Sequence, residues 1–276
     1  MSRLIRSLLL ILLFIPLTVS AFTPVATIQV DEEWQGASPE DVKAVLDSTL
    51  LAVSPYIGSR KLGAVIVKND EEGPISLYTK GDQGEYIVKL NVTGRYWAQM
   101  TYQFSHELCH LLSNYDLAPA NITHQQWFEE SLCEAFSLFA LERMAELWET
   151  HAPYASWQKY APEFQKYADN MKQEKHRSFA PRLSEWYHQQ RSLLESNPYA
   201  KDRQLNEKMA SHLLAIFEKE PRYWASINYI NLGENSEAMN LEKYMADWYQ
   251  YTPPDMKKPV AQIEEMLGIS NIATRQ

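Results

Sequence analysis

The sequence has only two cysteines, Cys109 and Cys133, which are too few to build a fold from disulfides. It has no low-complexity tract and no internal repeat, so neither a disordered chain nor a repeat array is expected. Beyond residue 21, no apolar run is long enough to cross a bilayer, which takes about 20 residues. Hydrophobic residues make up 45% and charged residues 22%, which is typical of a folded protein.

Positive charge is scarce as well. Lysine and arginine together number 26 against 35 aspartates and glutamates, which gives a formal net charge of -9 at pH 7. An acidic protein repels phosphate backbones, so nucleic acid is not an expected partner. The charge excludes little else, because acidic surfaces also keep proteins soluble.

Residues 1–21 have the layout of a secretory signal peptide. Arg3 and Arg6 form a basic start, residues 8–17 are mostly apolar, and small residues at 19–21 match a signal peptidase site. The apolar run is shorter than the roughly 20 residues of a membrane span, and an uncleaved N-terminal anchor is the alternative. We expect cleavage, no stable membrane insertion afterwards, and export to the periplasm or the extracellular space of a bacterium.

The chain changes character near residue 94. The earlier part has strand-like runs and one helix start, with Ser38 as the cap, Pro39 at the first position and acids in the first turn. The expected strands are 25–30, 62–67, 75–79 and 86–92, the last two as a hairpin. The expected helices after residue 94 are 95–113, 125–149, 157–176, 182–195, 201–219, 240–250 and 259–267.

These patterns predict an α+β protein with a small N-terminal mixed β-sheet and helices, followed by a mostly α-helical half. We expect an α/β subdomain at 22–115 and a helical subdomain at 116–276, each carrying one helix of the active site. A cleft between two such halves is a natural place for that site.

Residues 106–110 read His-Glu-Leu-Cys-His, the sequence HExxH. Residues i and i+4 share one face of a helix, so His106 and His110 can reach the same metal ion. Glu107 lies beside the first histidine, where its carboxylate can take a proton from a water at the metal and pass it to a leaving amine. The flanking residues contain no proline or glycine and have apolar residues at helical spacing, as a helix requires.

An ordinary helix with two surface histidines is the alternative. Phe104, Leu108 and Leu111 argue against it, because they predict a largely apolar and therefore buried helix. Two histidines and a glutamate on a buried helix need partners for their polar groups.

A catalytic zinc site needs a third protein ligand. Glu130 lies 20 residues after His110, which is far enough for one helix to end and a second to return. Glu134 is one turn later on the same face, and we expect it to accept a hydrogen bond from a zinc-binding histidine. Glu129 is the competing third ligand, but as the neighbour of Glu130 it points about 100° away on a helix.

HELCH followed by WFEESLCEA resembles the gluzincin group of metallopeptidases, which includes thermolysin-like enzymes and the M1 aminopeptidases. Their pattern is HExxH and then, about twenty residues later, a glutamate on a second helix, often within W-[LF]-x-E-G-x-A. The resemblance implies a zincin-like fold and one zinc ion per chain, held by His106, His110 and Glu130. It also implies Glu107 as the general base and a peptide bond as the substrate.

The departures from that pattern narrow the prediction. Ser131 and Cys133 replace the usual Gly and Ala, which conserves small size. The G-x-M-E-N motif of the M1 aminopeptidases is absent, so aminopeptidase specificity is not supported. No third histidine follows HExxH at the spacing of a metzincin, so the third ligand is not expected to be histidine.

Cys109 and Cys133 each come three residues after a predicted zinc ligand. Two helices that share a metal must pack closely, so the cysteines can form a disulfide in an oxidising compartment. The alternative is that both are small buried residues in a tight helix contact.

For two further features of the gluzincin group, the substrate-binding edge strand and the oxyanion-stabilising residue, the sequence offers several candidates. Substrate backbone pairs with an edge strand in that group, and either 75–79 or 86–91 can be this strand. A downstream Tyr or His stabilises the oxyanion, and the candidates are Tyr187, His188, Tyr199, His212, Tyr223 and Tyr229.

The sequence therefore predicts a secreted zinc metalloprotease, a hydrolase that cleaves peptide or protein substrates with a zinc-activated water. The second hypothesis is a zinc-containing binding or scaffolding module of the same fold with no catalytic activity. The intact Glu107 argues against this second hypothesis, because a structural zinc site has no use for a base at that position.

Overall fold

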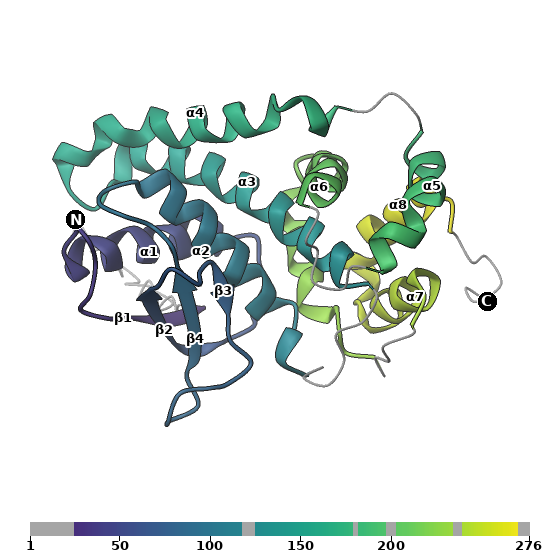
Figure 1. Ribbon diagram of the computed structural model, residues 1–276, viewed down its shortest axis with the longest axis horizontal. Coiled ribbons are helices and arrows are strands. Elements are labelled where there is room, and N and C mark those ends of the chain that lie inside the picture. The colour runs from purple at the N-terminus through teal and green to yellow at the C-terminus, as the bar shows by residue number, and fades with distance from the viewer. Residues whose placement is uncertain (1–24, 118–124, 179–181, 197–202, 234–238, 270–276) are drawn as a thin grey trace, which may run out of the picture.

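The computed structural model describes residues 25–117, 125–178, 182–196, 203–233 and 239–269. The predicted signal peptide at 1–21 and the oxyanion candidate Tyr199 lie outside these residues. Figure 1 shows a sheet with covering helices on one side of the molecule and an assembly of helices on the other.

A four-stranded mixed sheet forms in the N-terminal part. Its strands lie in the order β1 (Ala26–Val30), β2 (Gly63–Asn69), β4 (Tyr86–Leu90) and β3 (Ile75–Ser76). β1 pairs parallel with β2, β2 pairs parallel with β4, and β3 pairs antiparallel with β4. β3 is therefore an edge strand, while β4 has neighbours on both sides.

The sheet is joined to helix α1 (Pro39–Val53), which connects β1 to β2. Its start follows from local chemistry, because the Ser38 hydroxyl accepts the backbone N–H of Asp41 at 3.1 Å and Pro39 takes the first helical position. The apolar face of α1, with Val42, Val45 and Leu46, is fully buried.

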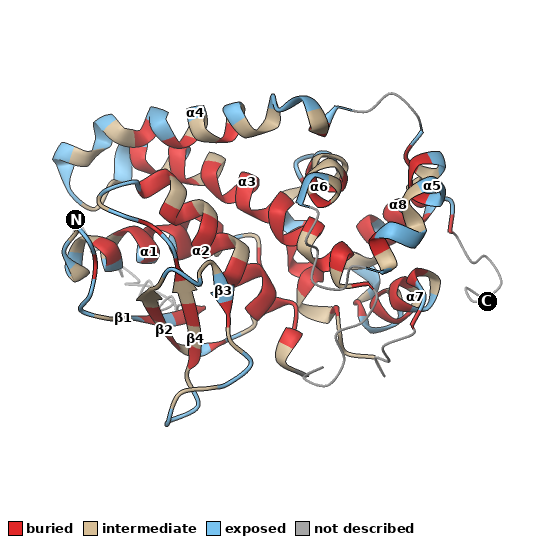
Figure 2. Ribbon diagram, in the orientation of Figure 1, coloured by how far each residue is buried: buried red, intermediate tan, exposed pale blue. Residues whose placement is uncertain are grey.

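Helices α2 (Trp97–Leu112) and α3 (Gln126–His151) form the centre of the molecule. α3 is buried on most of its faces for more than six turns, as expected of a helix surrounded by other elements. It packs against α1, α2, α4 and α6, and Figure 2 shows the buried residues continuing from α2 through α3 into the helical half.

The remaining helices cover α3 and complete the chain. They are α4 (Ala161–Lys172), α5 (Leu183–Glu195), α6 (Arg203–Phe217), α7 (Leu241–Tyr251) and α8 (Lys257–Leu267). Short 3-10 segments lie at Tyr115–Leu117, Ala155–Tyr160, Lys175–Arg177, Pro221–Tyr229 and Pro254–Met256. Four tryptophans that are almost fully buried, Trp127, Trp148, Trp224 and Trp248, lie in the one core shared by both halves.

The predicted α+β class is confirmed, with a mixed sheet first and a mainly helical half after it. The hairpin is confirmed too, although β3 has two residues instead of the expected five. The 3-10 segment Pro221–Tyr229 was not predicted, because its buried residues follow neither helical nor strand spacing. In the part of the chain that the structure describes, no helix is both long and apolar enough to span a membrane.

Candidate metal centre

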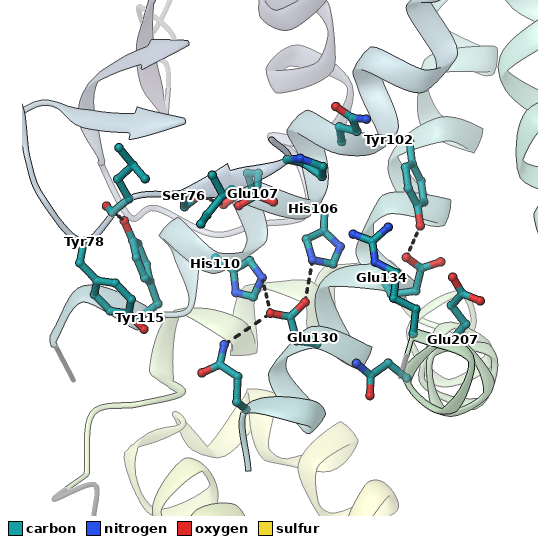
Figure 3. Close-up of a pocket in the computed structure, with 17 residues that line it drawn as sticks. Ser76, Tyr78, Tyr102, His106, Glu107, His110, Tyr115, Glu130, Glu134 and Glu207 are labelled. Atoms are coloured by element: carbon teal, nitrogen blue, oxygen red, sulfur yellow. Dashed lines mark hydrogen bonds and ion pairs between the residues drawn. The ribbon is translucent and has the colours of Figure 1, made fainter. Parts of the chain in front are cut away.

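Two histidines from α2 lie side by side at the centre of the molecule. His106 and His110 are one helical turn apart, and their ring centroids are 5.0 Å from each other. Both rings point toward α3 (Figure 3). HExxH thus gives the geometry predicted from its spacing.

Glu130 of α3 faces both rings. Its Oε2 lies 3.1 Å from His106 Nε2, and its Oε1 lies 3.5 Å from His110 Nε2. One ligand atom from each of the three residues lies within 4.8 Å of the others. Two ligands of a tetrahedral zinc ion at about 2.0–2.1 Å are about 3.3 Å apart, so the three side chains fit zinc with small adjustments.

The charges of these side chains are strongly coupled. Burial raises the pKa of Glu130, but the two histidines outweigh burial and hold that pKa well below its usual value. Burial lowers the pKa of His110, but the carboxylates of Glu130 and Glu129 outweigh it and raise that pKa well above its usual value. Both pKa shifts favour an ionised Glu130 beside a protonated His110 when no metal is bound.

Glu107 lines the same cavity as the three candidate ligands. Only 3% of its surface is exposed, and its backbone carbonyl accepts a hydrogen bond from the Ser76 hydroxyl of β3 at 3.4 Å. Glu107 therefore lies against the edge strand, on the same helix as the two histidines and on the wall of the same cavity.

The cavity has a volume of about 400 Å³ and joins both halves of the protein. On one side it is lined by the edge strand and the residues next to it, Pro74, Ile75, Ser76, Leu77 and Tyr78. Helices α2, α3 and α6 supply the other walls (Figure 3). Of the two candidate substrate strands, only β3 has a free edge, and it lies at the cavity.

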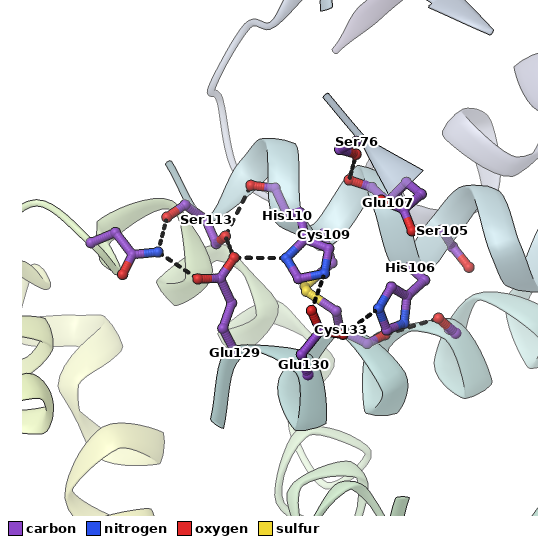
Figure 4. The surroundings of a disulfide bond; sticks show 12 residues. Ser76, Ser105, His106, Glu107, Cys109, His110, Ser113, Glu129, Glu130 and Cys133 are labelled. Atoms are coloured by element: carbon purple, nitrogen blue, oxygen red, sulfur yellow. Dashed lines mark hydrogen bonds and ion pairs between the residues drawn. A yellow bond between two sulfur atoms is a disulfide. The ribbon is translucent and has the colours of Figure 1, made fainter. Parts of the chain in front are cut away.

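The residue that holds a histidine in place is Glu129. Its Oε1 accepts from His110 Nδ1 at 2.7 Å and from the Ser113 hydroxyl at 2.7 Å. Its Oε2 accepts from Asn231 Nδ2 at 2.7 Å, and Tyr244 donates to the Asn231 carbonyl oxygen at 2.9 Å. Because a carboxylate only accepts, Nδ1 of His110 carries the proton and Nε2 is left to bind a metal (Figure 4).

The prediction that Glu134 accepts a hydrogen bond from a candidate zinc-binding histidine is wrong. Glu134 accepts from the Tyr102 hydroxyl and from Arg177 Nη2, the latter at 2.6 Å, and the contact to a histidine comes from Glu129. The reason is that α2 and α3 run antiparallel. Glu134, one turn beyond Glu130 on α3, therefore lies opposite Tyr102, one turn before His106 on α2.

Cys109 and Cys133 form a disulfide that joins α2 to α3, with their Cα atoms 5.2 Å apart. Both side chains are fully buried behind the histidines (Figure 4). Of the two alternatives for this pair, the disulfide is the one found. It also removes Cys133 as a metal ligand, although its sulfur lies near His110 and Glu129.

The downstream oxyanion candidates that the structure describes do not line the cavity. Its described lining includes none of Tyr187, His188, His212, Tyr223 and Tyr229. The tyrosines that do line it are Tyr78, Tyr102 and Tyr115. The hydroxyl of Tyr115 donates to the Leu77 carbonyl, and burial raises its pKa well above the usual value, so it stays protonated.

Sequence reasoning missed Ser113, Asn231 and Tyr244. Asn231 lies 102 residues from Glu129 and has a left-handed backbone with φ of 60°. Asparagine adopts this conformation more readily than most residues, but an asparagine in a loop is too common to single out. The sequence matches no family model and no curated protein, and the fold matches no solved structure.

Proposed function

We propose that this protein is a zinc-dependent peptidase. The observation that carries the proposal is the meeting of His106, His110, Glu130 and Glu107 at one cavity. Two imidazoles and one carboxylate leave one position of a tetrahedral ion open, which is the donor set of catalytic rather than structural zinc sites. Zinc at this position would polarise a carbonyl group and acidify a nearby water.

The protein side chains have separate tasks in the proposed reaction. Glu107 takes the proton of the attacking water and delivers it to the leaving nitrogen. Glu129 fixes the tautomer and orientation of His110. The free edge of β3 beside Glu107 can pair with an extended peptide backbone, which favours a peptide over a small-molecule substrate.

We further infer that the protein works in an oxidising compartment. The disulfide between Cys109 and Cys133 supports this, because such bonds persist in exported proteins and are rare in the cytosol. The basic and apolar pattern of residues 1–21 supports the same conclusion.

The proposal is tested with Glu107→Gln, which preserves size but removes the base. We expect the variant to bind zinc as the parent protein does and to cleave a peptide library at least 100 times more slowly, since general-base catalysis contributes about 10²–10⁴-fold. The matched control is Glu146→Gln, an exposed glutamate of α3. A zinc-loaded parent protein that cleaves no peptide would leave the non-catalytic binding module, and a variant as active as the parent would contradict Glu107 as the base.

A further inference from the structure

The cavity has a second polar region about one helical turn from the candidate zinc ligands. Glu134 follows Glu130 by one turn on α3, and Tyr102 lies opposite it on α2. Helix α6 adds Asn206 and Glu207 to the same wall. We call Tyr102, Glu134, Asn206 and Glu207 the acidic end of the cavity (Figure 3).

The acidic end contains more carboxylates than cations. Arg177, whose side chain is 1% exposed, lies 2.6 Å from Glu134, 3.2 Å from Glu174 and 3.8 Å from Glu207. His176 contacts Glu207 and Glu174, and among the described residues Arg177 is the only permanently charged cation in contact with the two cavity carboxylates, Glu134 and Glu207. Buried carboxylates are costly unless they are paired, so this region favours an additional positive charge.

Arg203 is the cation next to this group, one turn before Glu207 on α6. It is exposed, and it makes no ion pair with any residue that the structure describes. An exposed charge is screened by water and offsets a buried carboxylate only weakly. Arg203 therefore leaves the charge imbalance in place.

Asn206 supplies an independent polar group at the same wall. It is 5% exposed and lines the cavity, yet its carboxamide has no hydrogen-bond partner among the described residues. The carboxamide therefore opens onto the cavity, where a bound molecule can replace water as its hydrogen-bond partner. The pKa of Glu207 agrees, because burial and the charge of Glu134 raise it above the usual value, as expected for an underpaired carboxylate.

We propose that the acidic end binds a positively charged group of the substrate, namely a lysine or arginine side chain. The inference rests on the proposed peptidase function and adds a substrate class to it. The cationic head would lie near Glu134 and Glu207, and the Asn206 carbonyl oxygen would accept one of its hydrogens.

The direction of β3 indicates which residue of the substrate places its side chain at the acidic end. Ser76 contacts Glu107 in the middle of α2, and Leu77 contacts Tyr115 beyond its C-terminal end. β3 and α2 therefore run in the same direction, with the acidic end near the start of both. A peptide paired antiparallel to β3, the more stable arrangement, places the residue after the cleaved bond at the acidic end.

The same chemistry fits the α-amino group of a peptide that binds in the opposite direction. The test therefore uses matched peptides that carry lysine, arginine, norleucine or glutamate after the cleaved bond, each with a free or an acetylated N-terminus. Charge-assisted hydrogen bonds predict that kcat/KM for lysine exceeds that for norleucine by about tenfold or more. Glu207→Gln removes most of this ratio.

Glu174→Gln is the matched control, because Glu174 contacts the same Arg177 but does not line the cavity. It keeps the lysine preference near that of the parent protein. If the acidic end binds the α-amine instead, N-acetylation slows the lysine and norleucine peptides alike and no lysine preference appears, which overturns the side-chain assignment. Equal cleavage of the lysine and norleucine peptides overturns the inference and leaves the peptidase function intact.

Binding provides a readout that does not depend on hydrolysis. The affinity of Glu107→Gln for fluorescent lysine and norleucine peptides is measured by anisotropy, with and without the Glu207→Gln change. Tighter binding of the lysine peptide that Glu207→Gln abolishes supports the acidic end even if the parent protein cleaves nothing. Equal binding of both peptides, or no binding of either, overturns it.

Discussion

Glu129 links the candidate metal centre to residues far away in the sequence. Its buried carboxylate accepts hydrogen bonds from His110, Ser113 and Asn231, and Asn231 is held in turn by Tyr244. Outer hydrogen bonds of this kind orient a metal-binding imidazole and increase its basicity. The geometry at His110 therefore depends on a carboxylate that does not itself need to touch the metal.

Replacement of Glu129 by glutamine tests this role. An amide has one acceptor oxygen and turns its NH₂ group toward donors that the carboxylate satisfied, so we expect zinc affinity to fall by about 10- to 100-fold. Competition with a chromophoric chelator measures the affinity, and circular dichroism checks that the variant is folded. Glu146→Gln on the same helix is the control, and unchanged zinc affinity in Glu129→Gln would show that the network does not tune the ligand.

The coupled charges of the metal-free site predict a proton release. The raised pKa of His110 keeps it protonated at pH 7, and a metal binds only the neutral imidazole. Zinc binding at pH 7 should therefore release at least one proton, and the affinity should rise with pH. Calorimetry in buffers of different ionisation enthalpy measures the release, and a binding enthalpy that is the same in all buffers would contradict it.

The pKa directions also set the stability of the metal-free protein. The raised pKa of His110 contributes stability that is present below the unfolded value of about 6.5 and is lost as pH rises through the folded pKa. The lowered pKa of Glu130 contributes stability that is present above about 4.5 and is lost as pH falls through the folded pKa. The pair therefore stabilises the metal-free fold most between these limits.

At the scale of single residues, the sequence predicted those whose relative positions depend on one helix alone. His106, Glu107 and His110 share one helix, so their spacing fixes their relative positions. Whether Glu129 or Glu134 contacts a histidine depends on how α3 runs along α2, which the sequence pattern does not give. The contact from Asn231 was beyond prediction, because no local pattern records a hydrogen bond across 102 residues.

At the scale of elements, the pair of α2 and α3 is the framework of the site. The disulfide and the contacts of Glu129, Glu130 and Glu134 hold the two antiparallel helices together along about two turns of α2. Both helices are rich in large apolar residues and contain no glycine or proline. A rigid pair of this kind keeps ligands from two segments in register.

Removal of the disulfide tests the importance of this framework. It closes a separation of 24 residues, for which chain entropy predicts a loss of about 3 kcal/mol in the free energy of unfolding. We expect the Cys109→Ala, Cys133→Ala double variant to unfold about 5–10 °C below the parent protein, since about 1 kcal/mol shifts a midpoint by about 2–4 °C at this size. Calorimetry without reductant measures the shift, and an unchanged midpoint would show that helix packing alone holds the pair.

Helix positions were predicted well because they depend on local spacing and end signals. α3 was expected at 125–149 and is Gln126–His151, and α5 was expected at 182–195 and is Leu183–Glu195. The order of strands could not be read in the same way. β2 pairs parallel with β4 and leaves β3 at the edge. This order depends on contacts between strands and not on the pattern within any one strand.

At the scale of the whole molecule, the candidate metal centre is assembled from both halves. The N-terminal half supplies β3 and α2, α3 supplies Glu130, and Asn231 and Tyr244 reach the site from the last third of the chain. A single buried core runs through all of these elements. The two halves predicted from the strand and helix patterns are therefore expected to depend on each other for a complete site.

The presence of zinc at the site of His106, His110 and Glu130 is the central claim. A titration of metal-free, folded protein with zinc, followed by metal analysis of the desalted sample, tests it most directly. We predict about one zinc per chain, as three protein ligands and one open position require, and a large loss of zinc in His110→Ala. A folded protein that takes up no zinc, or that binds it equally well without His110, would contradict the account.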